Sequence, residues 1–345
     1  MFDNFHGKRL TNANRKTGNI PFLTASEINQ GVSAFLKNEK LDKYKDSITI
    51  DMFGHVFFHN YECSGDDNIY FFISEKLSNT IKRFISQCMQ NSCYRFSYGK
   101  QFRQKFADKL IILLPVLENG EPDFDFMENY IHELEQEKLS EYKSYAQKQV
   151  SELCYQEIEL LENKEWKAFL LTDLFENIQR GKRLTKEKQE EGQIPYISSS
   201  AQNNGVDNFI SNGTGVRIFE NCLSLANSGS VGSCFYEPFK FVASDHITHL
   251  KNSKNTKYSY LFTATLLNRL SQKYNFNREI NDKRISNEII ILPITSDGKP
   301  DYIYMEQYTK NLMLRKYCEY LDYKFKKSQT IYSFSAPYFL VAEKS

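Results

Sequence analysis

The pentapeptide GKRLT occurs at residues 7–11 and again at residues 181–185, and this repetition decides how the chain is organised. Each copy is followed by an Ile-Pro-aromatic step, Ile20-Pro21-Phe22 and Ile194-Pro195-Tyr196. The spacing between Gly7 and Gly181 also joins further identical pairs: Gly18 and Gly192, Ser26 and Ser200, Asn29 and Asn203, Gly31-Val32 and Gly205-Val206, and Phe35 and Phe209. The chain is therefore a tandem duplication, with a unit much longer than the repeats of solenoid proteins.

The second part of the repeat keeps a slightly different register. LLPVLENGEPDF (113–124) matches ILPITSDGKPDY (291–302). The spacing between Leu113 and Ile291 is slightly longer than that between Gly7 and Gly181, which indicates a small insertion within the second copy. With 345 residues in total, each copy is long enough to bury its own core, so two domains are expected.

Composition indicates a globular protein of the cytoplasm without contact to a membrane. The chain is 41% hydrophobic and 25% charged, and no apolar run reaches the length of a membrane span. The first residues do not have the pattern of a signal peptide. Seven scattered cysteines without a Cys-x-x-Cys pair argue against a disulfide framework and a zinc site.

The net charge of +1 conceals a separation of charge along the chain. Residues 127–165 contain ten Glu and four Lys, a local balance of −6, so the remainder of the chain carries +7. Phosphate binding requires a basic surplus, and this surplus lies in the two repeated parts. The charge pattern is therefore compatible with a nucleic-acid partner.

Both copies show the same order of expected elements. Strand-like runs come first (48–53, 55–61, 222–229, 233–239 and 246–250). An amphipathic stretch follows in each copy (78–90 and 258–273), and then a strand-like run ending in proline (110–115 and 289–293). The sequence predicts an α+β fold with two similar α/β domains.

A long helix closes each copy. The first is expected from about Met127 to about Asn163, a rod of roughly 55 Å, and the second from about Met305 to about Lys327. Their apolar stripes predict an antiparallel coiled coil that separates the domains, although each helix could instead pack on its own domain. The predicted boundaries are 1–125 and 166–304 for the domains, 126–165 and 305–328 for the helices, and 329–345 for a C-terminal tail.

The signatures of catalysis are absent from the sequence. It contains no GxxxxGK[ST] phosphate loop, no GxGxxG, and no Asn-Pro-Pro-aromatic step of an adenine methyltransferase. Pro122-Asp123 and Pro300-Asp301 precede helices, so we interpret the aspartates as helix caps or first-turn acids rather than nuclease residues. His246 and His249 would point to opposite faces of a strand, which favours structural or DNA-facing roles over metal binding. We predict a non-catalytic chain without a metal or cofactor.

Four polar segments are candidates for contact with DNA. FSYGKQFRQKFADK (96–109) and NFNREINDKRISNE (275–288) mix basic, amide and aromatic side chains, which can pair with phosphates and base edges. TASEINQ (24–30) and SSSAQNN (198–204) share one place in the repeat but differ in polar detail, although either could be an ordinary surface loop. The Lys-Arg pairs that are identical in both copies are expected to contact phosphates or the scaffold. The predicted DNA-binding residues are Lys8, Arg9, Thr24, Ser26, Gln30, Lys100, Gln101, Arg103, Gln104, Lys105, Lys182, Arg183, Ser198, Ser199, Ser200, Asn203, Asn204, Arg278, Asn281, Lys283 and Arg284.

Five blocks carry a resemblance to a known family. They are WKAFLLTDLFENIQRGKRLT (166–185), IPYISSSAQNNGV (194–206), LANSGSVGSCFYEPFKFVASDHIT (225–248), IDMFGHVFFHNYECSGDDNIYFF (50–72) and FSYGKQFRQK (96–105). In these blocks the chain resembles the specificity subunits of type I restriction–modification systems and their type IIB relatives. The resemblance covers nearly the whole chain.

The resemblance implies a function. Two target recognition domains would each read one part of a split double-stranded DNA site, and the long helices would separate them and dock DNA adenine methyltransferase subunits. S-adenosylmethionine would bind to that partner, and a restriction or translocase subunit would be a further partner, separate or fused. The residues expected to dock the partner are Ile131, Leu134, Tyr142, Leu312 and Tyr317.

Two points depart from the family pattern or compete with it. The first copy begins at the equivalent of Phe175 and so lacks the strand that Trp166 opens in the second copy. We expect the β-prone tail Thr330–Ser345 to pack on the first domain in its place. The competing hypothesis is an interaction or regulatory protein, derived from such a subunit, whose duplicated domains bind protein instead of DNA.

Overall fold

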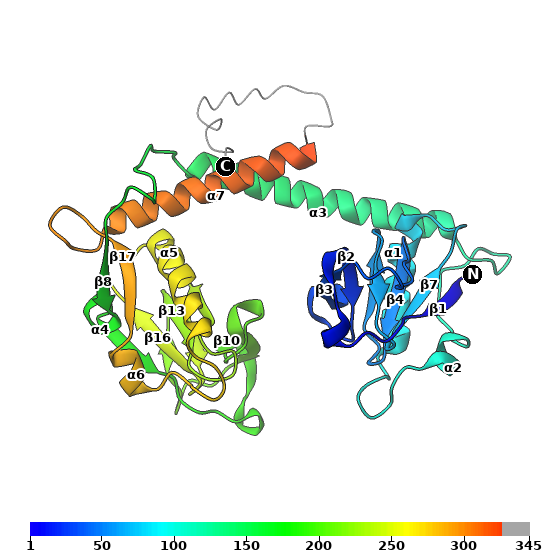
Figure 1. The fold of residues 1–345 in the computed structure, drawn as a ribbon, viewed down its shortest axis with the longest axis horizontal. Coiled ribbons are helices and arrows are strands. Elements are labelled where there is room, and N and C mark those ends of the chain that lie inside the picture. Colours follow the sequence, from blue (N-terminus) through cyan, green and yellow to red (C-terminus); the bar gives the residue numbers. More distant parts are fainter. Residues whose placement is uncertain (326–345) are drawn as a thin grey trace. The chain divides into compact units, whose positions relative to one another are not determined.

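The computed structural model describes residues 1–325, which form two compact units, residues 1–142 and residues 143–325 (Figure 1). We call them the N-terminal unit and the C-terminal unit. Both mix helices with strands, which confirms the predicted fold class at this level. The expected packing of the tail Thr330–Ser345 lies outside the described residues.

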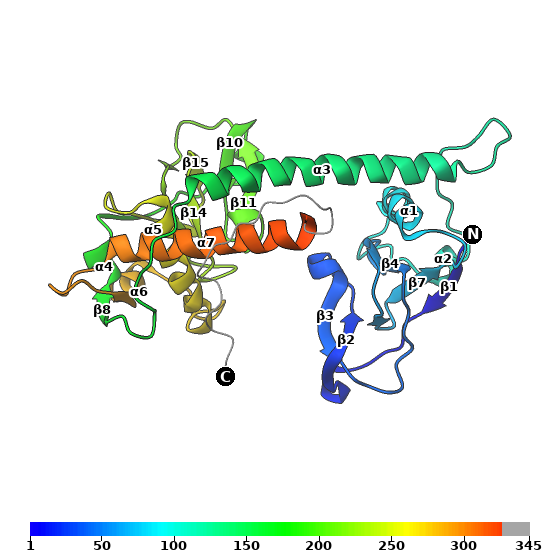
Figure 2. The same ribbon diagram turned by 90° about the horizontal axis from the view of Figure 1, so that it is seen from above.

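Two sheets build the N-terminal unit. The first consists of antiparallel strands in the order β1 (Asp3–His6), β7 (Ile69–Ile73), β4 (Ser47–Asp51) and β5 (Val56–His59). The second has the order β3 (Val32–Leu36), β2 (Thr17–Leu23) and β6 (Ser64–Gly65), and Figure 2 shows β2 and β3 side by side.

Helix α1 (Asn79–Cys93) packs against β4 and β5. The Ser78 hydroxyl accepts a hydrogen bond from the Ile81 amide at 3.2 Å and so caps the first turn. Ile81 and Ile85 on α1 bury their side chains together with Ile48 and Ile50 of β4, and each fully buried side chain contributes about 1.5–3 kcal/mol. A short helix, α2 (Gln104–Ala107), follows α1.

The C-terminal unit repeats this arrangement with a fourth strand in its second sheet and an additional pair of strands. Its first sheet has the order β14 (Cys234–Glu237), β13 (Cys222–Ala226), β16 (Ile247–Lys251) and β9 (Asn177–Arg180). Its second has the order β11 (Val206–Ile210), β10 (Glu191–Ile197), β15 (Phe241–Ala243) and β12 (Ile218–Phe219). The additional pair is β17 (Ile289–Pro293) with β8 (Trp166–Leu170), and the helices are α4 (Leu171–Leu174), α5 (Lys257–Leu267) and α6 (Asp282–Ser286).

The prediction of a strand at residues 110–115 was wrong. The equivalent segment of the C-terminal unit, β17, pairs over its whole length with β8. In the described part of the N-terminal unit no strand corresponds to β8, so residues 110–115 have no ladder and are not a strand. Ile111 and Leu113 are consequently 81% and 88% exposed.

The two long helices are α3 (Phe124–Glu152) and α7 (Tyr302–Phe325). Each begins three residues before the expected start, directly after its aspartate, because Asp123 accepts a hydrogen bond from the Phe126 amide at 2.9 Å and Asp301 accepts one from the Tyr304 amide at 3.0 Å. These bonds confirm the interpretation of both aspartates as caps.

The expected extension of the first helix to about Asn163 was wrong, because α3 ends at Glu152. Side chains of α7 bond the backbone that follows: Gln307 donates to the Cys154 carbonyl at 2.9 Å, and Tyr304 donates to the Glu159 carbonyl at 2.9 Å. These hydrogen bonds to α7 take the place of the backbone hydrogen bonds that would continue α3. Helix propensity alone did not indicate this change. Helix α3, with 29 residues, is therefore roughly 44 Å long.

Both long helices pack on their own units near their N-termini. In the N-terminal unit Ser78 donates to Glu128 of α3 at 2.9 Å, and Arg83 pairs with Glu135. In the C-terminal unit the Thr256 hydroxyl, before α5, donates to Glu306 of α7 at 2.8 Å. The alternative that each helix packs on its own domain is thus confirmed for these ends.

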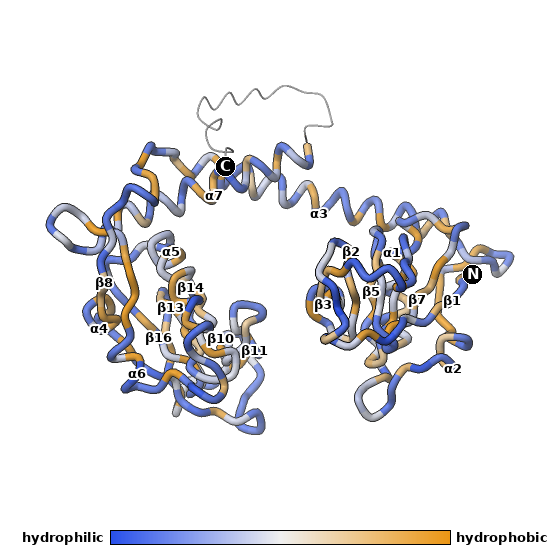
Figure 3. The backbone as a smooth tube through the Cα atoms, viewed as in Figure 1, coloured by the Kyte–Doolittle hydropathy of each residue, from blue (hydrophilic) through white to orange (hydrophobic). Residues whose placement is uncertain are grey.

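Within the C-terminal unit, the last turns of α3 also lie along α7. The hydroxyls of Tyr145 and Tyr317 are 3.2 Å apart, and the Lys143 ammonium lies 4.9 Å from the centre of the Phe325 ring. Together with the bond from Gln307 to Cys154, this order of contacts is antiparallel. Figure 3 shows α3 as mostly hydrophilic, whereas β17 is hydrophobic.

The repeated glycine of GKRLT makes the closest backbone approach in each unit. The Gly7 amide donates to the Ile69 carbonyl at 2.9 Å, and the Gly181 amide donates to the Ile247 carbonyl at 2.8 Å. A Cβ atom on either glycine would lie closer than 3.0 Å to backbone carbonyls of the neighbouring turn, Gly65 and Asp66 in one unit and Ala243 and Ser244 in the other. Only glycine fits there.

Gly181→Ala is therefore expected to lower the free energy of unfolding of the C-terminal unit by about 3 kcal/mol, because backbone must move to admit the methyl group. The measurement is urea unfolding followed by tryptophan fluorescence, since Trp166 is the one tryptophan of the chain and lies in β8. Gly213→Ala is the control, because no atom lies within 4 Å of a Cβ at that position. Equal midpoints for the two variants would contradict the steric argument.

Two buried titratable side chains occupy equivalent places at the ends of β5 and β14. His59 is bonded to the Thr49 hydroxyl at 2.9 Å, and burial lowers its pKa to about 4. Glu237 accepts a hydrogen bond from the Ser224 hydroxyl at 2.8 Å, and burial raises its pKa to about 7. Burial disfavours the charged form in both cases, so the units should respond to pH in opposite directions.

The Glu237 carboxyl stabilises the C-terminal unit when protonated. Its contribution is fully present below its ordinary pKa of 4.5 and is lost as the pH rises through about 7, with a total on the order of 3 kcal/mol. Glu237→Gln should flatten this dependence in urea unfolding followed by Trp166 fluorescence between pH 4.5 and 8. His59→Gln, in the N-terminal unit, is the control and should leave the fluorescence curve unchanged. An unaltered slope in Glu237→Gln would refute the assignment.

Candidate nucleic-acid interface

A turn at residues 65–68 brings the predicted segments of the N-terminal unit together. The Lys8 amide donates to the Gly65 carbonyl at 2.9 Å, and the Asp66 amide donates to the Leu23 carbonyl at 2.9 Å. The first bond places Lys8 and Arg9 against the turn, and the second places the loop 24–30 beside it. We call this arrangement the N-terminal cluster.

Two arginines flank that turn. An Arg9 guanidinium nitrogen lies 4.0 Å from an Asp67 carboxylate oxygen, and Arg103 donates to the Asn68 side chain at 3.3 Å. Arg103 also bonds Gln101. The three predicted segments of this unit, which are far apart in the sequence, therefore meet at one surface.

The equivalent turn of the C-terminal unit, residues 243–246, gathers its segments in the same way. The Lys182 amide donates to the Ala243 carbonyl at 3.0 Å, and the Ser244 amide donates to the Ile197 carbonyl at 3.0 Å. The loop at Asn227 connects the last segment, because its amide donates to the His246 carbonyl and its carbonyl accepts from the Ile280 amide, both at 2.9 Å. We call this arrangement the C-terminal cluster.

The loops 24–30 and 198–204 have nearly the same backbone. Ser26 and Ser200 accept hydrogen bonds from the amides two residues later, at 3.1 and 3.0 Å. The left-handed conformation occurs at Asn29 and Gln30 in one loop and at Asn203 and Asn204 in the other. Turn geometry thus accounts for the serine and for the left-handed Asn and Gln residues of both loops. For these residues, and for Thr24, Ser198 and Ser199, contact with DNA remains a prediction.

A basic cavity of about 460 Å³ lies in the C-terminal cluster. It is lined by Lys273, Tyr274, Arg278, Asn281, Lys283, Arg284, Asn287 and Glu288, four of which were predicted DNA-binding residues. Glu288 is buried and holds the Lys273 ammonium at 2.8 Å, and this hydrogen bond raises the pKa of Lys273. Tyr274 also donates a hydrogen bond to Glu288. Burial is the main cause that raises the pKa of Tyr274, and the hydrogen bond to Glu288 raises it further.

The N-terminal cluster has apolar side chains at three of the eight corresponding positions and Lys or Arg at the other five. The register that matches Leu113 with Ile291 places Phe96 at the position of Tyr274, Phe106 at that of Arg284 and Leu110 at that of Glu288. The rings of Phe96 and Phe106 meet edge to face at 5.0 Å. The same backbone therefore presents a polar, charged cavity in one unit and a closed aromatic cluster in the other.

Several predicted residues already have partners within their units. The Lys8 ammonium lies 2.8 Å from the Asp42 carboxylate, and this hydrogen bond raises the pKa of Lys8. Gln104 donates to the side chains of Asn4 and Asp108, and Asn281 accepts from the Arg284 amide at 2.9 Å as the cap of α6. Lys100, Lys105, Lys182, Arg183 and Lys283 are exposed.

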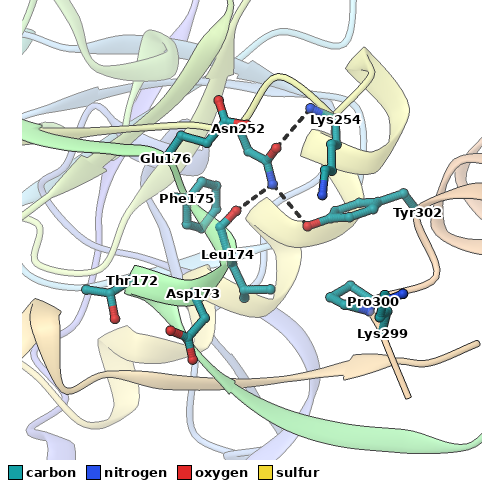
Figure 4. A pocket seen from close by; sticks show the side chains of 10 residues that line it. All are labelled: Thr172, Asp173, Leu174, Phe175, Glu176, Asn252, Lys254, Lys299, Pro300 and Tyr302. Carbon is teal, nitrogen blue, oxygen red and sulfur yellow. Dashed lines mark hydrogen bonds between the residues drawn. The ribbon is translucent and has the colours of Figure 1, made fainter. Parts of the chain in front are cut away.

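A second cavity, of about 400 Å³, lies at the start of α7, away from these basic residues (Figure 4). Asn252 donates to the Leu174 carbonyl and, at 3.0 Å, to the Tyr302 hydroxyl across its wall. The Asn252 side chain also accepts a hydrogen bond from the Lys254 amide at 2.9 Å. These bonds join α4, the residue after β16 and α7, so the cavity belongs to the scaffold of the unit.

The histidines do not form a metal site. His249 is buried and stacks on Phe219 with ring centres 3.8 Å apart, while His246 bonds Ser228. Among residues 1–325 no group of three or more His, Cys, Asp or Glu could hold a metal ion. Burial raises the pKa of Cys63 and Cys222 to about 12, which makes these thiols poor nucleophiles.

The residues predicted to dock a partner lie on the long helices. Leu134 and Tyr142 on α3 are exposed, and Ile131, Leu312 and Tyr317 are partly buried. Tyr317 contacts Tyr145, so this side chain contributes to the packing of the C-terminal unit. No helix within the described range 1–325 is long and apolar enough to cross a membrane.

Our sequence reading missed two exposed aromatic residues. Tyr98 and Phe276 are 84% and 78% exposed and occupy equivalent positions, in the register that matches Leu113 with Ile291. Each lies at the tip of a tight turn inside a segment that we had selected for its mixture of basic, amide and aromatic residues. A comparison of the two copies could have identified this position, since an aromatic residue occupies it in both.

Comparison with known proteins identifies the family. The sequence model of the family described as type I restriction modification DNA specificity domain matches residues 2–143 and 163–318. The type II restriction enzyme BgcI specificity subunit S.BcgI of Heyndrickxia coagulans is 29% identical over 321 residues, which are 89% of this chain and 91% of that subunit.

Solved structures of similar proteins include the type I restriction–modification system S subunit from M. genitalium, with a TM-score of 0.46, 15% identity, and coverage of 94% of this chain and 89% of that one. The HsdS subunit from Thermoanaerobacter tengcongensis has a TM-score of 0.34, 11% identity, and coverage of 94% and 91%. The family assignment rests on the sequence match and confirms the resemblance. The chain belongs to the type I restriction modification DNA specificity domain family and is a non-catalytic specificity subunit of a restriction–modification system.

Proposed function

We propose that the chain reads a two-part DNA target, with one part contacted by each unit, and positions DNA N6-adenine methyltransferase subunits on it. The observation that carries this proposal is the pair of clusters, which share a backbone and differ in their side chains. A shared scaffold suits contacts with phosphates, which are the same at every base pair. Different side chains suit the reading of two different base sequences.

The residues that are identical in both copies and the residues that differ correspond to these two kinds of DNA contact. Lys8 and Arg9 match Lys182 and Arg183, and their backbones lie against equivalent turns. In contrast, Phe106 and Leu110 stand where the other unit has Arg284 and Glu288. We assign phosphate contact to the invariant pairs and base reading to the variable positions of each cluster.

Charge supports the same assignment. The segment 96–109 carries four Lys or Arg and one Asp, and the segment 275–288 carries three Lys or Arg and three acidic residues, of which Glu288 is paired with Lys273. The acidic surplus of the chain lies between residues 127 and 165, outside both clusters. Anionic duplex DNA would therefore be attracted to the clusters and repelled by α3.

For the long helices we propose the roles of spacer and docking surface. Helix α3, at roughly 44 Å, is somewhat longer than one turn of duplex at about 34 Å. Exposed side chains such as Leu134 and Tyr142 would contact the methyltransferase subunits. S-adenosylmethionine would bind to those subunits, which would flip the target adenine from the stack, and a restriction or translocase subunit would be a further partner.

The test is sequencing of modified bases in a host that carries this chain and its methyltransferase partner. We expect N6-methyladenine in a motif of two short parts separated by unspecified bases. Replacing residues 1–125 with the corresponding residues of a subunit of different specificity should change one part of the motif and leave the other unchanged. Replacing residues 166–304 is the reciprocal control and should change the other part.

Two results would contradict the proposal. A replacement of residues 1–125 that alters both parts, or neither, would show that the units do not read separately. Absence of any modified motif, in a host where the chain and its partner are expressed and associate, would favour the competing hypothesis of an interaction or regulatory protein.

A further inference from the structure

The two exposed aromatic residues missed by the sequence reading are presented by tight turns. Ser97 and Lys100 exchange both backbone hydrogen bonds at 3.1 Å, which leaves Tyr98 and Gly99 at the tip. Asn275 and Arg278 do the same at 3.2 and 2.9 Å, which leaves Phe276 at the tip. A two-residue turn closed by two bonds places its tip residues at the surface, where the Tyr98 ring also stacks beside that of Phe53 with ring centres 6.4 Å apart.

The base of each turn is fixed to the sheet by an equivalent glycine. Gly54 and Gly232 both have positive φ angles, of 91° and 88°. A Cβ atom on Gly54 would lie 2.6 Å from the Cys93 carbonyl oxygen, and one on Gly232 would lie 2.5 Å from the Ser271 nitrogen. The segments before both turns are therefore packed directly on the backbone between β4 and β5 and between β13 and β14.

The tips lie at the ends of the domains that are remote from the long helices. Helix α1 contacts α3 through Ser78 and Arg83 near its N-terminus, and the turn with Tyr98 follows its C-terminus. With 15 residues, α1 separates these ends by about 22 Å. In the C-terminal unit α5 contacts α7 through Thr256, and the turn with Phe276 follows the other end of α5. Figure 1 shows the segment between α1 and α2 protruding as a loop.

Cations surround both tips. Lys100 closes the first turn, and Arg278 closes the second and places its guanidinium 5.3 Å from the centre of the Tyr274 ring, at the wall of the basic cavity. A protein partner that buried Tyr98 or Phe276 in an apolar pocket would have to desolvate these charges. A nucleic acid offers phosphates for the cations and base faces for the ring.

We propose that Tyr98 and Phe276 are wedge residues: each inserts its ring at a base step of the DNA part read by its own unit and stacks on the exposed base. This inference rests on the proposed function and adds a residue role to it. Insertion partly unstacks the step, and the contacts of the neighbouring Lys100 or Arg278 with phosphates offset that cost. The two wedges would deform each part of the target independently.

The experiment uses the full chain with its methyltransferase partner and a duplex containing the motif found by sequencing of modified bases. 2-Aminopurine, placed at successive steps of each part in separate duplexes, reports unstacking by a rise in fluorescence. Tyr98→Ala should abolish the rise in one part and Phe276→Ala in the other, and each should weaken binding about tenfold or more. Tyr98→Phe should behave as the unsubstituted chain, because the stacking face is retained.

Matched controls separate stacking from loss of an exposed apolar side chain. Tyr94→Ala removes a tyrosine that is also 84% exposed but precedes the turn, and its equivalent in the C-terminal unit is Gln272. Ile303→Ala removes an exposed side chain on α7. Both controls should leave the fluorescence and the affinity for DNA unchanged.

The outcomes distinguish the wedge from the proposed function. If the unsubstituted complex binds and methylates its motif while both tip variants bind with unchanged affinity and fluorescence, the wedge is overturned and the proposed function stands. If the tip variants bind DNA normally but lose the methyltransferase subunit, the turns contact protein, which also overturns the wedge. Failure of the unsubstituted complex to bind any motif would overturn both.

Discussion

The close approach of a glycine backbone to a neighbouring turn is the constraint on which both units depend. At Gly7 and Gly181 there is no room for a Cβ atom, because carbonyls of residues 65–66 and 243–244 lie directly against the glycine. This contact positions the following Lys-Arg pair and brings the loop after β2 or β10 to the same turn. The repeated GKRLT therefore marks a joint of the scaffold, and the variable side chains are arranged around it.

The sequence predicted those features that depend on local pattern and on the repeat. The duplication, the strands at 48–53 and 222–229, and the aspartate caps of α3 and α7 all follow from residue chemistry at fixed spacing. The end of α3 at Glu152 did not, because Tyr304, Gln307 and Asn311 of α7 bond the backbone beyond it. Residues 110–115 likewise have the composition of a strand but lack a pairing strand in the described part of their unit.

The candidate site was predictable as a set of segments, and less so as a set of side chains. The sequence selected the basic segments after α1 and α5, and the structure brings each of them to the turn that also holds the Lys-Arg pair. It could not show that Gln104 and Asn281 bond within their own units, because those partners depend on the folded backbone. The aromatic content of both segments was evident from the sequence, but Tyr98 and Phe276 were not singled out, because only a position-by-position comparison of the copies shows that they are equivalent.

The central claim is that one scaffold, used twice, presents two different DNA-reading surfaces. Hydrogen–deuterium exchange of the chain bound to its methyltransferase partner, with and without the target duplex, tests this claim most directly. We predict that DNA slows exchange in both units, at residues 96–109 and 275–288 and at the two GKRLT segments, without further protection of α3 and α7. Protection confined to one unit, or to the long helices, would contradict the account.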